Sequence, residues 1–125
     1  MNIKHSFLMS TILACTSLST YAGTVVCSGK VDKVAYHGNN KLMVKLDSMN
    51  KPVFFCNPEA EWTVSGTSYK TGPETCKVMY STFLAALMSD KTIHALYFDG
   101  DDVPATCAEW GDWKNASLRH YSLSK

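Results

Sequence analysis

Alternating apolar and polar positions predict three strands in the first half of the chain. The stretch 24–36 is rich in β-favouring residues, and its alternation breaks near Gly29 or Asp32, where a bulge or a bend fits. In 41–47, apolar side chains alternate with charged ones, which is the clearest strand pattern in the sequence. A third strand is predicted at 53–56. Turn-forming Gly, Asn, Asp and Ser residues separate these strands, so we expect an antiparallel meander.

Helical spacing replaces this alternation after residue 72. Pro73 suits the first helical turn because its φ is preset, and the charge of Glu74 favours the positive end of the helix dipole. The helix is predicted to end at about Ser89, with strands following at 92–98 and 118–123. Its apolar face is predicted to comprise Cys76, Tyr80, Phe83, Leu84, Leu87 and Met88. This order of elements indicates an α+β, mainly β fold with five strands and one packed α-helix.

The first 22 residues have the three zones of a secretory signal peptide. Lys4 and His5 give a basic start, 7–14 is apolar, and a polar stretch ends at Ala22. We expect cleavage after Ala22, which leaves a single exported domain at 23–125. The apolar run is shorter than the roughly 20 residues of a membrane-spanning helix, so we expect no transmembrane segment.

A second interpretation of this leader is lipidation at Cys15. Ile12-Leu13-Ala14-Cys15 resembles the bacterial lipobox, in which cleavage precedes a cysteine that then receives acyl chains. Leu13 is bulkier than the residue usually found at its position. The prediction is therefore a periplasmic or secreted protein, with a lipid anchor at Cys15 as the alternative.

The other four cysteines predict two structural disulfides in an exported domain. No CxxC pair is present, which disfavours a zinc site or a redox-active pair. The helix rises about 1.5 Å per residue and the following strand returns at about 3.3 Å per residue, so the next loop is expected to start near the helix N-terminus. We therefore predict the pairs Cys76–Cys107 and Cys27–Cys56.

The charge balance of the exported domain disfavours a nucleic-acid partner. Without Lys4, 11 basic residues balance 11 acidic ones, and Arg119 is the only arginine. Nucleic-acid binding normally requires a basic excess or patch.

Asp99-Gly100-Asp101-Asp102 lacks the spacing of a calcium loop and predicts a solvated turn. Since no acid, base and nucleophile converge, we expect no enzyme, no metal and no cofactor.

The most suggestive cluster consists of Glu109, Trp110, Asp112 and Trp113, which share one polar loop. Indole rings stack on the apolar face of a pyranose, and carboxylates accept its hydroxyl protons. The alternative is that both tryptophans fold back over the end of the sheet. A binding role predicts that Trp110 or Trp113 is exposed. The same two alternatives apply to Trp62, whose stretch either extends a strand or covers the sheet edge.

The stretch Thr75-Cys76-Lys77-Val78-Met79-Tyr80-Ser81-Thr82-Phe83-Leu84-Ala85-Ala86-Leu87, followed by the strand 93–98, resembles a segment of bacterial AB5 toxin B subunits of the subtilase-cytotoxin type. The resemblance is one of element order and covers most of the exported domain. It implies an OB-like five-stranded antiparallel barrel or curled sheet, glycan binding and assembly into a homo-oligomer. This chain differs by a cysteine at the helix start and a Trp-rich loop after the fourth strand, so no binding residue is transferred.

Two functional hypotheses follow from these observations. The first is an exported, non-catalytic binding module whose ligand is a glycan. The second is a periplasmic structural or inhibitor protein that contacts another exported protein through a sheet edge or a loop. An enzyme ranks third, because no catalytic constellation is visible.

Overall fold

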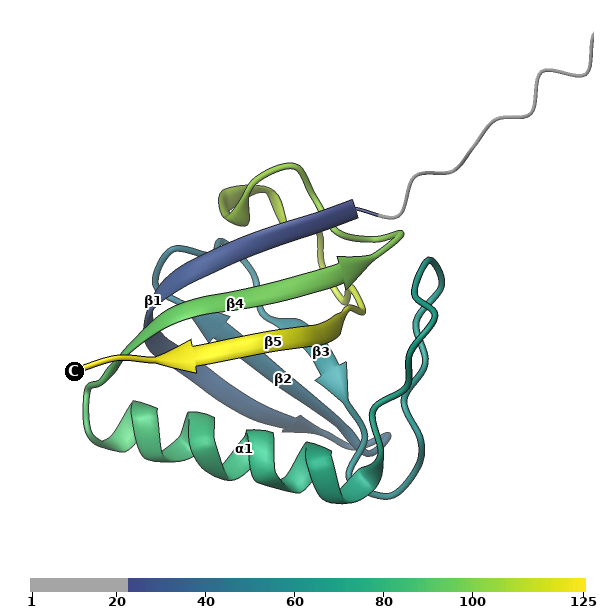
Figure 1. Ribbon diagram of the computed structural model, residues 1–125, viewed down its shortest axis with the longest axis horizontal. Coiled ribbons are helices and arrows are strands. Elements are labelled where there is room, and N and C mark those ends of the chain that lie inside the picture. The colour runs from purple at the N-terminus through teal and green to yellow at the C-terminus, as the bar shows by residue number, and fades with distance from the viewer. Residues whose placement is uncertain (1–22) are drawn as a thin grey trace, which may run out of the picture.

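The computed structural model describes residues 23–125 (Figure 1). The predicted signal peptide, its cleavage after Ala22 and the alternative lipid site at Cys15 lie outside the described residues. The elements are β1 (Gly23–His37), β2 (Lys41–Leu46), β3 (Val53–Cys56), α1 (Pro73–Met88), β4 (Thr92–Gly100), the 3₁₀ turn η1 (Cys107–Glu109) and β5 (Ser117–Leu123). In the described part of the chain, no helix is long and apolar enough to cross a membrane.

All five strands belong to one antiparallel sheet in the order β3-β2-β1-β4-β5. The first three strands form the predicted meander, and α1 lies between β3 and β4 along the chain. Figure 1 shows the sheet curled, with the helix running across its open lower side. The predicted α+β, mainly β fold with a curled sheet and one packed helix is confirmed.

The curl of the sheet depends on a change of partner along β1. Residues 23–30 pair with β4, whereas residues 31–37 pair with β2, and register shifts mark the transition. Gly29 has φ +142° there, and a Cβ at this position would collide with the carboxylate of Asp47. That carboxylate accepts a hydrogen bond from the Lys30 backbone N–H at 3.2 Å. The bulge expected near Gly29 is therefore present, because glycine alone fits both the backbone and the space.

The two edge strands of the sheet approach each other at one end. A parallel bridge joins Phe54 of β3 to Asn115, two residues before β5. Its hydrogen bonds run from the Phe54 N–H to the Lys114 carbonyl and from the Ala116 N–H to the Phe54 carbonyl, both at 2.9 Å. The curled sheet is thus linked across its edges without closing into a full barrel.

The helix packs into the core through a narrow strip of side chains. Phe83 lies edge-on to Phe55 at 5.3 Å and to Tyr121 at 5.5 Å, which connects α1 to both edge regions of the sheet. The buried strip comprises Cys76, Met79, Phe83 and Ala86. Leu84 and Met88 were expected on this face, but they are 39% and 80% exposed. Spacings of three and four residues keep the strip on one side, and these two positions are rotated away from it.

The disulfide pairs differ from the predicted pairs. The structure joins Cys27 to Cys107 and Cys56 to Cys76, so the predictions of Cys76–Cys107 and Cys27–Cys56 are wrong. Because β4 runs antiparallel to β1 and ends opposite Gly23, the loop after β4 begins beside the first residues of β1. Figure 1 places that loop and the helix on opposite sides of the molecule. The two disulfides are consistent with a location outside the reducing cytoplasm.

A long loop, residues 57–72, connects β3 to α1 and is called the arm below (Figure 1). Its two halves are joined by backbone hydrogen bonds between Trp62 and Thr71 at 2.8 and 3.0 Å. Trp62 is buried, and its indole N–H donates to the Ala116 carbonyl at 3.0 Å. Trp62 therefore covers the sheet edge and does not extend a strand.

Candidate ligand-binding site

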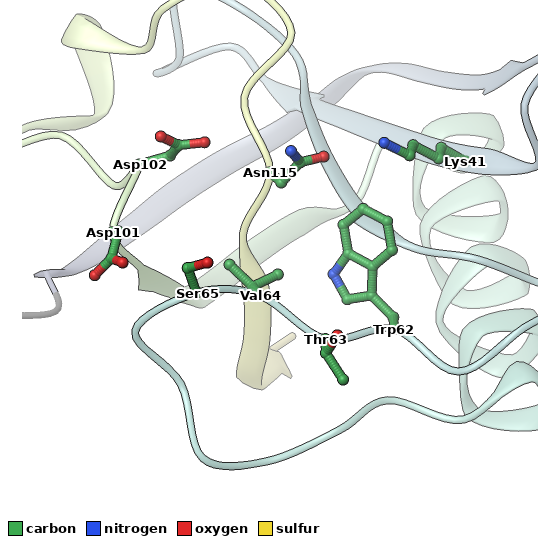
Figure 2. A pocket seen from close by; sticks show the side chains of 8 residues that line it. All are labelled: Lys41, Trp62, Thr63, Val64, Ser65, Asp101, Asp102 and Asn115. Carbon is green, nitrogen blue, oxygen red and sulfur yellow. The ribbon is translucent and has the colours of Figure 1, made fainter.

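A polar pocket of about 440 Å³ lies between the arm and the two ends of the β4–β5 loop. Figure 2 shows Asp101 and Asp102 on one side of it, Lys41 and Trp62 on the other, and Asn115 between them. The remaining lining residues, Thr63, Val64 and Ser65, come from the arm. Three separate segments thus build the pocket: the start of β2, the arm and the β4–β5 loop.

The arm is fixed against the sheet beside this pocket. The Asp101 N–H donates to the Ser65 carbonyl at 2.9 Å, which ties the arm to the end of β4. Val64 packs against Gly100, where a Cβ would lie 2.8 Å from its Cγ1 atom. Gly100 also has φ +146°, a conformation that side chains rarely adopt. Glycine at this position therefore lets the arm form a wall of the pocket.

Lys41 places a positive charge over two aromatic rings, that of Trp62 in the pocket wall and that of the buried Phe54 beside it. Its Nζ atom lies 5.3 Å from the ring centroid of Phe54 and 5.5 Å from that of Trp62. Such positions are held by cation–π attraction. Within residues 23–125, no carboxylate lies at salt-bridge distance from Lys41. The ammonium group is therefore available to oxygen atoms of a ligand.

Trp113 extends the aromatic surface outward from the pocket. Its ring stacks on Phe54 at 6.0 Å, and His37 lies edge-on to it at 5.4 Å. Trp113 is 64% exposed, so one side of its ring packs on Phe54 while the rest faces solvent. Its backbone has φ +59°. The continuous set Trp62, Lys41, Phe54 and Trp113 is called the aromatic strip below.

Asn115 supplies a polar group that is not satisfied within the described residues. Its Oδ1 atom is buried without a hydrogen-bond partner there, although the residue lines the pocket. Buried polar atoms in proteins are nearly always paired, so this atom is an unmade hydrogen bond beside the pocket. Asp102 faces the same space and has a loose ion pair with Lys114 at 3.6 Å. The pocket thus offers both donors and acceptors to a polar ligand.

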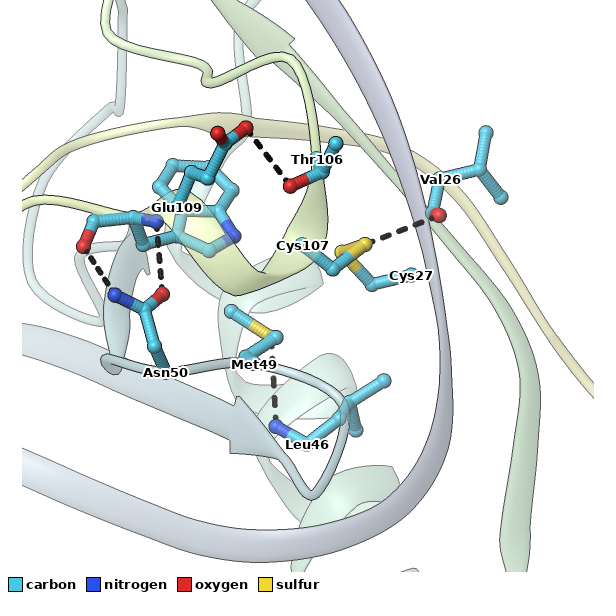
Figure 3. Close-up of a disulfide and its surroundings, with 9 residues drawn as sticks. Val26, Cys27, Leu46, Met49, Asn50, Thr106, Cys107 and Glu109 are labelled. Atoms are coloured by element: carbon cyan, nitrogen blue, oxygen red, sulfur yellow. Dashed lines mark hydrogen bonds between the residues drawn. A yellow bond between two sulfur atoms is a disulfide. The ribbon is translucent and has the colours of Figure 1, made fainter.

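Trp110 does not belong to this site, contrary to the prediction. Only 2% of its surface is exposed, and its ring lies edge-on to Phe98 at 5.3 Å. The side chain of Asn50 holds its backbone through two hydrogen bonds of 2.8 Å, one to the Trp110 carbonyl and one from its N–H (Figure 3). The indole therefore acts as a core residue under the loop, as the alternative interpretation proposed.

The other predicted members of the cluster are separated as well. Glu109 accepts a hydrogen bond from the Thr106 hydroxyl at 2.8 Å, and Asp112 pairs with Lys51 at 3.1 Å. Neither residue lines the pocket. Of the four predicted binding residues, only Trp113 lies on the aromatic strip.

The Cys27–Cys107 disulfide holds the loop that carries these residues (Figure 3). The Cys107 sulfur lies 3.2 Å from the Val26 carbonyl oxygen, a packing contact because a disulfide sulfur has no hydrogen to donate. Asn50, from the β2–β3 turn, holds the same loop through its two hydrogen bonds to the Trp110 backbone. The disulfide thus links the middle of the β4–β5 loop to β1, whereas the pocket residues Asp101, Asp102 and Asn115 lie near the two ends of the loop.

Sequence reasoning missed Lys41, Asn115 and the arm as parts of a site. Lys41 looked like an ordinary charged position of an alternating strand, and its role depends on the edge-to-edge bridge at Phe54. The acidic turn at 99–102 was the one sequence feature considered for ligand binding that contributes residues to this pocket. Asp101 and Asp102 line the pocket, whereas Asp99 is buried elsewhere. In the part of the chain that the structure describes, no group of three or more metal-ligating side chains occurs.

Comparison of the chain with protein-family models, with curated proteins and with solved structures finds no match. The function is therefore argued from the chemistry of the site.

Proposed function

We propose that this protein is an exported, non-catalytic, OB-like binding module whose ligand is a glycan. The order β3-β2-β1-β4-β5, with a helix after β3 and a parallel bridge between Phe54 and Asn115, supports an OB-like architecture. OB-fold modules bind oligosaccharides or oligonucleotides on the β2–β3 face and its adjoining loops. The pocket lies there, since Lys41 begins β2 and Asn115 belongs to the β4–β5 loop.

The observation that carries the proposal is the exposed ring of Trp113 beside a pocket with unpaired polar groups. A sugar places its apolar face on an indole and directs its hydroxyl groups sideways to polar side chains. In this arrangement the Lys41 ammonium donates to a sugar oxygen, and the carboxylates of Asp101 and Asp102 accept from its hydroxyl groups. The balanced charge of the domain favours a saccharide over a nucleic acid.

The proposal includes a location in the periplasm or outside the cell, reached after signal-peptide cleavage behind Ala22. The alternative remains a lipid anchor at Cys15. The intact mass of the protein purified from its native host decides between them. A mass that starts at Gly23 supports the first, and a mass increased by acyl chains on Cys15 supports the second.

A glycan array tests the proposed ligand class. The array is probed with the mature disulfide-bonded domain, and a parallel sample carries Trp113→Ala. We expect a set of related glycans to bind the unaltered domain and to lose signal with Trp113→Ala. Absence of any hit, or identical hits with both samples, would contradict the proposal.

The second hypothesis, binding to an exported protein, is supported by apolar side chains on the outer side of α1. Val78 is 60% exposed, Leu84 39% and Met88 80%. Exposed apolar groups gathered on one element are typical of contact surfaces. Purification from the native exported fraction tests this hypothesis. It predicts a stoichiometric partner, or a second copy of the chain, that is lost with Val78→Asp or Met88→Asp.

A further inference from the structure

A second cavity, of about 360 Å³, lies on the other side of the arm. The arm contributes residues 62–65 to the first pocket and residues 66–69 to this one. The polar residues that line the second cavity are Thr24, Thr67, Ser68, Tyr69, Asp99 and Arg119. Unlike the first pocket, which contains two carboxylates and one ammonium group, this cavity contains one carboxylate and one guanidinium group.

The carboxylate of Asp99 is fully engaged within the structure. Its Oδ1 atom accepts a hydrogen bond from the Thr24 hydroxyl at 2.5 Å. Its Oδ2 atom accepts one from the Tyr69 hydroxyl at 2.9 Å and lies 3.4 Å from the Arg119 Nε atom. Burial is the largest cause that raises the pKa of Tyr69, and the hydrogen bond to Asp99 is the second. The Tyr69 hydroxyl therefore stays protonated, as a donor, over the physiological pH range. The carboxylate of Asp99 is therefore held by three partners from three different segments, of which only Arg119 carries a compensating charge.

Arg119 retains donors that Asp99 does not use. Among residues 23–125, its ion pair runs through Nε, and the guanidinium carbon lies 5.3 Å from the Tyr97 ring. The ring and the carboxylate hold the group in place, while half of the side chain is exposed and lines the cavity. The two terminal amino groups of a guanidinium match the two oxygens of a carboxylate.

We propose that this cavity is a second ligand site, which takes a hydroxylated carboxylate such as the uronic-acid unit of a saccharide. The ligand carboxylate binds the terminal amino groups of Arg119. The ligand hydroxyl groups face Thr67 and Ser68, and the Thr67 hydroxyl already donates to the Val64 carbonyl at 2.9 Å, which leaves its oxygen as an acceptor. This inference does not depend on the proposed glycan site, because the two cavities share no lining residue.

Nuclear magnetic resonance titration of the mature domain tests the second site with a matched pair of probes. Methyl glucuronide carries a carboxylate where methyl glucoside carries a hydroxymethyl group. We expect the glucuronide to shift the backbone amides of Thr24, Thr67 and Ser68, which line the cavity, and the glucoside to bind at least ten times more weakly. Equal binding of both probes, or shifts confined to the first pocket, would overturn the proposal.

Variants show whether Arg119 and the cavity are responsible. Arg119→Gln is expected to weaken glucuronide binding at least tenfold, and the exposed charge-loss control Lys91→Gln to leave it unchanged. Because Arg119→Gln also removes a partner of Asp99, Ser68→Asp provides an independent test at an exposed position that leaves that cluster intact. It places a negative charge at the cavity and is expected to abolish glucuronide binding while the thermal midpoint stays unchanged. Persistence of binding in both variants would refute the site.

Discussion

Val64 rests against Gly100, and this contact acts together with the hydrogen bond from the Asp101 N–H to the Ser65 carbonyl to position the arm between the two cavities. Gly100→Ala is expected to destabilise the protein by about 1–3 kcal/mol, because alanine is strained at φ +146° and its Cβ would push Val64 away. Gly38→Ala is the matched control, since no atom lies within 4 Å of the added methyl group there. Urea unfolding measures both variants. Equal midpoints for the two would contradict this role of Gly100.

Tyr69 gives the protein a specific response to alkaline pH. Its pKa is raised in the folded state, so the unfolded chain loses the tyrosine proton first, at about pH 10. The contribution of Tyr69 to stability is therefore complete below pH 10 and is lost as the pH rises above it. We expect the free energy of unfolding to fall more steeply above pH 10 in the unaltered protein than in Tyr69→Phe.

Lysine titration affects the unaltered protein and Tyr69→Phe equally, so the difference between their stability curves isolates the tyrosine. Parallel curves between pH 8 and pH 11 would show that burial and the hydrogen bond to Asp99 do not raise the pKa of Tyr69 in the folded protein.

The arm and the β4–β5 loop are elements whose positions depend on disulfides. Cys27–Cys107 spans 80 residues and Cys56–Cys76 spans 20. The chain-entropy model gives about 4.5 and about 3 kcal/mol for loops of these lengths. Replacing both cysteines of Cys27–Cys107 by serine is therefore expected to lower stability more than replacing those of Cys56–Cys76.

Denaturant unfolding measures this difference, and mass mapping of a non-reduced digest identifies the pairs directly. A peptide that joins Cys27 to Cys107 is expected. Recovery of a Cys76–Cys107 peptide would contradict the arrangement of the loop above the sheet.

The strands and the helix were predictable because their signals are local. Alternation, turn residues and Pro73 at the first helical turn located six elements without knowledge of the rest of the chain. The disulfide pairs were not predictable in this way. The lengths of the helix and of the next strand do not show which other strand lies beside the loop that carries Cys107. That placement comes from the pairing of β4 with β1, which puts Gly100 opposite Gly23.

The site shows the same limit at the two tryptophans of the β4–β5 loop. Trp110 and Trp113 have similar neighbours in sequence, yet one is 2% exposed and the other 64%. Only the bridge from Phe54 to residues 114–116 turns Trp113 outward onto the strip. Lys41 becomes part of the site through the same bridge. The long-range bridge between the two edges of the sheet, which local patterns do not report, therefore assembles the proposed binding surface.

The molecule as a whole combines a disulfide-linked curled sheet with one arm that separates two polar cavities. Residues 23–125 carry balanced charge, so long-range steering would contribute little to capture of the proposed ligand. Affinity must then come from stacking and short-range hydrogen bonds. Both depend on the β4–β5 loop, which the Cys27–Cys107 disulfide fastens at its middle.

The central claim is that a glycan binds on the aromatic strip, and the most direct test is calorimetric titration with a glycan selected on the array. Trp113→Ala is expected to weaken binding about tenfold, which corresponds to about 1.4 kcal/mol of lost stacking. Lys41→Ala is expected to weaken it severalfold, and the exposed apolar control Met88→Ala on α1 to leave it unchanged. Unchanged affinity in Trp113→Ala and Lys41→Ala, with a well-folded domain, would contradict the claim.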